Sequence, residues 1–221
     1  MIWGSAARRS TSIFALPNDM PRGFLSDTQQ RQYGCYSADP NETQLTRFFH
    51  LDDTDLTLIN KRRRDYNRLG FALLLTTVRF LGTFMPDSSD VPQTVIQFVA
   101  LQLAITNSDY IANYRVRRAT GVAHRTEIQH HYRYQDFHSP PWRFRLSRML
   151  YSRAWISNER PSLLFDIGTA WLIQHKVLLP GATVLQRLII EIRERASNQL
   201  WNRLAVLPTP VDFIQILQSI N

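Results

Sequence analysis

The apolar residues of this chain recur at the three- and four-residue spacing of an amphipathic helix, and this spacing constrains the fold most strongly. Between Asp65 and Leu81 they form one stripe, and a longer stripe begins at Thr183. No stretch shows the sustained alternation of apolar and polar residues that a half-buried strand requires. The sequence therefore predicts an all-α fold. The stripes consist of Leu69, Ala72, Leu73, Thr76 and Phe80, and of Val184, Leu185, Leu188, Ile192, Ala196, Leu200 and Leu204.

Capping and breaking residues divide the remainder into shorter helices. Ser26 is placed to cap a short helix that Gly34 ends, and Asp52 and Asp53 are interpreted as an N-cap and a first-turn acid rather than as catalytic groups. Gly82 predicts the end of the helix that begins at Asp65. The further helices are expected from Pro92, over 108–114, over 120–132, from Trp142 to about Ile156, from Pro161 to about His175, from Thr183 to Leu204, and over 211–220.

The charge of the chain is concentrated in one window. Lysine and arginine together number 26 against 18 acidic residues, giving a net charge of +8, and all the basic residues except Lys61 and Lys176 are arginine. Residues 110–160 hold 10 basic and 3 acidic residues, so +7 lies in this window. Such a field attracts a polyanion, and arginine matches phosphate and guanine better than lysine does. Codon usage in a GC-rich genome is the alternative explanation for the abundance of arginine.

The sequence contains none of the motifs that would indicate an enzyme. It has no glycine-rich phosphate loop and no nucleophile elbow, and His124 and His131 are too far apart for the i, i+4 metal pair of a helix. We therefore expect no catalytic residue, no metal and no cofactor. Cys35 is the single cysteine, which excludes an internal disulfide and favours a cytoplasmic protein. The longest apolar run, five residues from Phe71, is too short to cross a membrane.

Two groups of residues are candidate DNA contacts. The first is a basic turn between two predicted helices, where a helix N-terminus would add to the affinity for phosphate; a solvated turn is the alternative. The candidates are the four cations of the turn, Lys61, Arg62, Arg63 and Arg64, together with Asn67 and Arg68 in the helix that follows.

The second group lies in the basic window, where the helices over 108–114 and 120–132 resemble a helix-turn-helix. We expect Arg125, Gln129, His130 and Arg133 to point outward, opposite a face formed by Val122 and Ile128, and to read bases or hold phosphates. The neighbouring aromatic residues Trp142, Phe144, Tyr151 and Trp155 are interpreted as core. The full second group is Arg115, Arg117, Arg118, His124, Arg125, Gln129, His130, Arg133, Arg143, Arg145 and Arg148.

Two long segments resemble a known family. INKRRRDYNRLGFALLLTTVRFLGTF from Ile59 and RAWISNERPSLLFDIGTAWLIQHKVLLPGATVLQRLI from Arg153 are similar to the Tn-three family of replicative class II transposases, and MPRGFLSDTQ from Met20 resembles its usual start. The resemblance implies a helical region with tandem helix-turn-helix-like modules that bind the terminal inverted repeats of a transposon. In this family the DDE catalytic centre lies in a longer C-terminal region, so this chain is expected to bind DNA without cutting it.

These observations predict an organisation and a function. Residues 1–19 are interpreted as a tail, 20–138 as a first helical DNA-binding module and 139–221 as a second, ending before any catalytic region. The expected partner is double-stranded DNA, with a homodimer or a full-length transposase as further partners, in the nucleoid of a bacterial cytoplasm. The alternative is a protein-interaction module that pairs with and regulates a full-length transposase. An independent enzyme has the weakest support.

Overall fold

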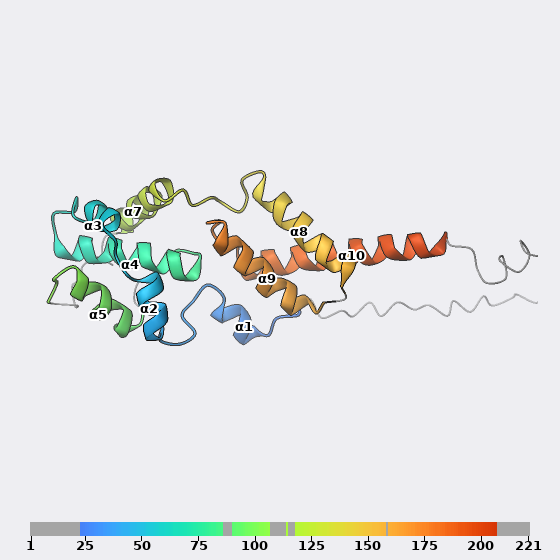
Figure 1. Ribbon diagram of the computed structural model, residues 1–221, viewed down its shortest axis with the longest axis horizontal. Helices are drawn as coiled ribbons and strands as arrows, with labels where there is room; N and C mark the ends of the chain where they lie inside the picture. Colours follow the sequence, from blue (N-terminus) through green and yellow to red (C-terminus); the bar gives the residue numbers. More distant parts are fainter. Residues whose placement is uncertain (1–22, 86–89, 107–113, 115–117, 158, 207–221) are drawn as a thin grey trace, which may run out of the picture.

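The computed structural model describes residues 23–85, 90–106, 114, 118–157 and 159–206, and in this part of the chain it confirms the all-α fold. The described residues form no named strand; an isolated parallel bridge joins Gln135 to Val177. Figure 1 shows an elongated molecule in which the helices form two groups along the long axis. No helix among the described residues is long and apolar enough to cross a membrane.

The first half is built around α4 (Asp65–Leu81), which is buried along most of its length. Around it pack α2 (Glu42–Phe48), α3 (Asp53–Ile59), α5 (Gln93–Gln102) and α7 (Arg118–His131). The apolar stripe predicted for this helix forms the centre of a core that includes Phe49, Phe71 and Ile128, each with no exposed surface. Burial of such side chains is the main stabilising contribution to this half.

The second half contains α8 (Trp142–Ile156), α9 (Pro161–Gln174) and α10 (Ala182–Ala205), with α1 (Asp27–Gln32) beside them. Its separate core includes Leu146, Leu150 and Leu172. Residues near α1 belong to this core although they precede the first half in sequence, since the ring of Tyr33 lies 5.0 Å from that of Phe165. The described part of the chain thus begins in the second half at residue 23, forms the first half and then returns to the second. The boundary between modules at residues 138 and 139 stays a prediction.

Most predicted helix boundaries agree with the structure. The Ser26 side chain accepts a hydrogen bond from the Gln29 amide, the Asp52 side chain caps α3 in the same way, and Gly82 ends α4 in the left-handed conformation with φ 75°. Differences of one or two residues occur where Pro92 is the N-cap of α5 and where α7 and α10 begin. The helices predicted over 108–114 and 211–220 lie outside the described residues, except for Tyr114, and so does the predicted tail.

The two halves are joined by backbone hydrogen bonds. Gln135 donates its amide to the Lys176 carbonyl at 2.8 Å and accepts from the Leu178 amide at 2.8 Å. The Leu179 amide donates to the Gly82 carbonyl at 3.0 Å. A side chain at Gly82 would meet Ile173 at 2.6 Å, so the end of α4 approaches the second half closely because it has no Cβ.

Candidate nucleic-acid interface

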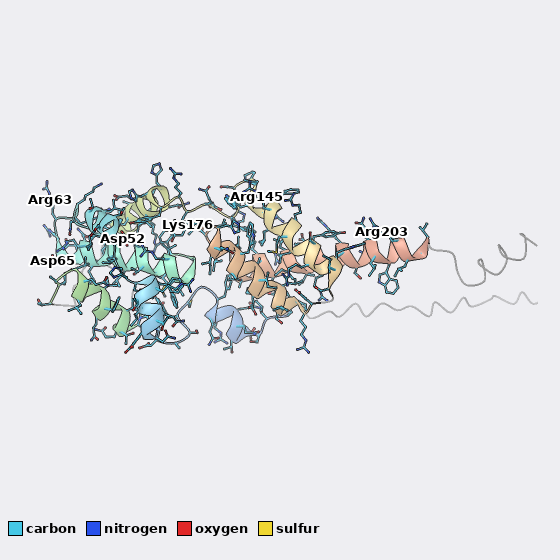
Figure 2. All side chains as sticks on the ribbon, viewed as in Figure 1. Asp52, Arg63, Asp65, Arg145, Lys176 and Arg203 are labelled. Atoms are coloured by element: carbon cyan, nitrogen blue, oxygen red, sulfur yellow. The ribbon has the colours of Figure 1, made fainter. Side chains whose placement is uncertain are left out.

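The basic turn between α3 and α4 places three of its four cations outward. The side chains of Lys61, Arg63 and Arg64 are exposed, and Figure 2 shows Arg63 at the outer corner of the first half. Arg64 occupies the N-cap position of α4 without a capping side-chain hydrogen bond, and its guanidinium lies over Tyr66, 5.8 Å from the ring centroid. The turn therefore presents positive charge beside a helix N-terminus, where amide groups also attract anions.

Arg62 in the same turn points inward. Its side chain is 8% exposed, and its guanidinium lies 3.7 Å above the centre of the Phe71 ring. It donates to the Leu58 carbonyl and to the Glu127 carboxylate, which ties the turn to α7. Arg62, a candidate DNA contact, is therefore buried and paired within the protein and is not an exposed cation.

Arg68 supports the turn from within, and Asn67 lies beside it in sequence. Arg68 donates to Asp65 at 3.1 Å and to the Asn60 side chain at 3.0 Å, so it connects the end of α3 to the start of α4. The Asn67 side-chain oxygen is buried and has no hydrogen-bond partner in the described part of the chain. We infer that Arg68 positions the exposed cations of the turn.

His124 was expected at the DNA surface but belongs to the core of the first half. It is 8% exposed, its ring stacks on Tyr114 with the centroids 5.6 Å apart, and its Nδ1 lies 2.9 Å from the Tyr114 hydroxyl. Burial, followed by the charge of Arg62, lowers the pKa of His124 from 6.5 to about 4. Its imidazole is therefore neutral near pH 7 and does not attract phosphate.

The face of α7 that points inward differs from the prediction. Ile128 is buried as expected, but Val122 is 59% exposed. Arg125 is half-buried and donates to the Met85 carbonyl at 2.7 Å, so its predicted outward orientation is wrong. The helix is rotated because the buried stripe uses His124, a polar residue that finds a partner in Tyr114.

The other residues predicted on this segment lie at its end or outside the description. Gln129 is half-buried, whereas His130 and Arg133 are exposed. Of Arg118 only the backbone, at the start of α7, is described; Arg115, Arg117 and most of the preceding predicted helix lie outside the described residues, so the helix-turn-helix arrangement stays a prediction.

The helix α8 carries a second set of outward cations. Arg143, Arg145 and Arg148 are all exposed, and Arg145 lies over Trp142, 5.1 Å from the ring centroid. In Figure 2, Arg145 lies along the same edge of the view as Arg63. Phe144 is 69% exposed, so its interpretation as core is wrong. Arg143 and Arg148 line a groove between α8 and α10.

Part of the positive window is neutralised by a carboxylate. Arg153 donates to Glu159 at 2.9 Å, and this hydrogen bond lowers the pKa of the Glu159 carboxyl. The arginines thus divide into inward or paired ones and outward ones. Lys176, which was not a candidate, is also exposed and lies between the two halves (Figure 2).

The described residues contain no group of three or more His, Cys, Asp or Glu side chains placed to hold a metal ion. What this part of the chain offers is exposed guanidinium and ammonium groups on two helical halves, arranged beside helix ends. Groups of this kind can attract anions.

The fold and the surface define an all-helical, arginine-rich region, and comparison with known proteins shows its family. Residues 24–192 match the family described as "Domain of unknown function (DUF4158)", and the chain belongs to this family.

The curated relatives are transposases, which confirms the resemblance seen in the motifs. The chain is 53% identical over 199 residues to the transposase for transposon gamma-delta of Escherichia coli K12, covering 90% of this chain and 20% of that protein. It is 29% identical over 181 residues to the transposase for transposon Tn1546 of Enterococcus faecium, covering 82% and 18%. It is 30% identical over 186 residues to the transposase for transposon Tn501 of Pseudomonas aeruginosa, covering 84% and 18%. The chain spans about a fifth of the length of these relatives.

Proposed function

We propose that this chain binds double-stranded DNA at the terminal inverted repeats of a transposon, as the DNA-recognising portion of a transposase. The observation that carries the proposal is the set of outward cations on the turn before α4 and on α8, in a chain whose relatives are transposases. Arg63 and Arg145 represent the two groups, and neither forms an ion pair within the described part of the chain. Free guanidinium groups of this kind gain affinity by releasing counterions from phosphate.

Not all predicted contacts fit this proposal equally. The exposed residues remain candidates for phosphate or base contact, whereas Arg62, Arg68, His124 and Arg125 act by holding the scaffold. The exposed candidates are Lys61, Arg63, Arg64, His130, Arg133, Arg143, Arg145 and Arg148.

Binding of labelled duplexes, measured by fluorescence anisotropy, tests the proposal. A terminal-repeat duplex should bind at least about a thousand-fold more tightly than a scrambled duplex at physiological salt. If about seven phosphates are contacted, the logarithm of the affinity should fall against the logarithm of salt concentration with a slope of about −6. Equal affinity for both duplexes would refute sequence-specific recognition.

We further propose that the chain alone does not cleave DNA. The proposal is supported by its length, about a fifth of that of the transposase relatives. Incubation of supercoiled plasmid carrying terminal repeats with Mg²⁺ and this chain should leave the plasmid intact, and nicking that depends on the protein would contradict the proposal.

A homodimer, or a pair with a full-length transposase, is the remaining part of the proposal. It is supported by the end of α10, where Leu200, Trp201 and Leu204 are 44%, 66% and 45% exposed. Exposed apolar patches of this kind mark interaction surfaces. Sedimentation equilibrium should show a dimer that Trp201→Glu dissociates; a monomer at every concentration would exclude the homodimer.

A further inference from the structure

Two exposed cations flank the backbone bridge that joins the halves, and both have a backbone conformation that favours glycine. Arg133 has φ 60° and Lys176 has φ 53°. Among the described residues, Ala104 with φ 55° is the one other non-glycine residue with positive φ. The left-handed region is uncommon for residues other than glycine, asparagine and aspartate, and residues held there concentrate at functional sites.

The cause of this conformation is the same at both positions. The Tyr134 amide donates to the Gln129 carbonyl at 2.9 Å and the Arg133 amide to the His130 carbonyl at 3.4 Å. After α9, the Val177 amide donates to the Leu172 carbonyl at 2.9 Å and the Lys176 amide to the Ile173 carbonyl at 3.1 Å. Both helices therefore end in a Schellman motif with a cation at the position where glycine is most favourable.

The side chain and backbone of Gln135 hold the two turns next to one another. Its amide donates to the Lys176 carbonyl at 2.8 Å, and its Nε2 donates to the Arg133 carbonyl at 3.1 Å. Each cation-bearing residue is thus fixed through its own carbonyl to the same glutamine. The two cations come from different halves of the molecule, so their proximity depends on the junction being intact.

Both charges are available for a ligand. Arg133 and Lys176 are exposed, and neither forms an ion pair with any described residue. The nearest acidic residue in the sequence, Asp136, accepts a hydrogen bond from the His138 amide at 2.7 Å. Figure 2 places Lys176 between the halves, beneath the edge on which Arg145 lies.

We propose that Arg133 and Lys176 form a paired phosphate-binding element at the junction of the halves. The two side chains would bind phosphates of a DNA duplex that lies across both halves. This inference rests on the proposed DNA binding and adds Lys176 to the contacts. The competing explanation is that each cation stabilises the end of its helix by interacting with the helix dipole. When each residue is replaced by glycine, the helix-dipole explanation predicts a lower melting temperature, whereas phosphate binding predicts a lower affinity for DNA.

The test is the double variant Arg133→Gly with Lys176→Gly, compared with Ala104→Gly as the matched control. Glycine relieves the same backbone conformation at all three sites, but the control removes no charge. The expected melting temperature of the double variant is equal to or above that of the wild type, by up to about 3 °C. Its affinity for a mixed-sequence duplex should fall on the order of ten-fold, and its salt slope should become less steep by about 2. Ala104→Gly should raise the melting temperature and leave DNA binding unchanged.

Three results would overturn the pairing. The first is a double variant that melts lower but binds duplex as the wild type does, which is the helix-dipole explanation. The second is a double variant that melts at the same temperature as the wild type and whose duplex binding has the same salt dependence. The third is pair-dependent binding to phosphatidylserine vesicles with duplex binding unaffected. A wild type that prefers no sequence would refute terminal-repeat recognition but not the pair, since phosphate contacts are independent of sequence.

Discussion

The arginines of the two halves differ in how many turn inward, although each half also holds the other kind: Arg63 and Arg64 of the first half are exposed, and Arg153 of the second half is paired with Glu159. In the first half, Arg62, Arg79 and Arg125 turn inward and satisfy carboxylates or carbonyls. In the second half, α8 holds an apolar core on one side and leaves Arg143, Arg145 and Arg148 outside. A high arginine count therefore does not by itself measure DNA contact, because a guanidinium can serve as a structural donor as readily as a phosphate ligand.

The largest expected effect concerns the carboxylate at the centre of the first half. Asp55 has no exposed surface; it accepts from Arg79 at 2.9 and 3.0 Å and from the Tyr132 hydroxyl. Asp55→Ala removes the carboxylate partner of the Arg79 guanidinium, which keeps only the His50 carbonyl, and of the Tyr132 hydroxyl and the Asp52 amide. Urea denaturation should therefore show a loss of about 3 kcal/mol. The control Asp52→Ala removes an exposed cap and should cost about 1 kcal/mol. Equal losses would mean that the buried network adds nothing beyond helix capping.

The next largest effect is a loss of folding stability in acid, which arises from His124 in the core of the first half. The pKa of His124 is lowered from 6.5 to about 4 in the folded protein. Between pH 6.5 and 4 the unfolded chain therefore binds a proton at His124 that the folded chain does not bind. The free energy of unfolding is highest above pH 6.5 and falls by about 3 kcal/mol as the pH drops toward 4. His124→Leu should flatten this pH dependence of urea denaturation, whereas the exposed His130→Gln should keep it. A pH dependence that persists in His124→Leu would contradict the assignment.

A smaller effect distinguishes two roles for Arg125, which are support of the fold and contact with DNA. Because its guanidinium donates to the Met85 carbonyl, Arg125→Ala should cost about 1–2 kcal/mol in thermal denaturation. The salt slope of DNA binding should not change, since no phosphate contact is removed. Unchanged stability with relaxed base preference would instead support the base-reading role that the sequence suggested.

Local patterns predicted most of the fold. The helices from Asp65, Trp142 and Pro161 follow from apolar spacing and from the residues that begin or end them, all of which are short-range signals. The role of Asp52 as a cap was predicted for the same reason. Differences of one to three residues arose at helix ends, where fraying and competing caps have similar energies, and the short helix α2 was not predicted.

Contacts between distant residues were not predictable in this way. Asp55 and Tyr132 are 77 positions apart, and an acid at the third position of α3 looks like an ordinary capping-box residue. His124 was a candidate DNA contact because it lies in the basic window, but it is buried and its ring is paired with the hydroxyl of Tyr114. The inward turn of Arg125 follows from that rotation, which is why the candidate site was only partly predicted.

The salt dependence of duplex binding by Arg143→Gln with Arg145→Gln and Arg148→Gln tests the central claim most directly. These side chains lie outside the core, so the free energy of unfolding of the triple variant, obtained from thermal denaturation, should be within about 0.5 kcal/mol of that of the wild type. The slope of the logarithm of affinity against the logarithm of salt concentration should become less steep by about 3, because each lost cation releases about one counterion fewer. A variant that folds normally and keeps the full wild-type slope would contradict the claim that the outward arginines, rather than the inward ones, hold the DNA.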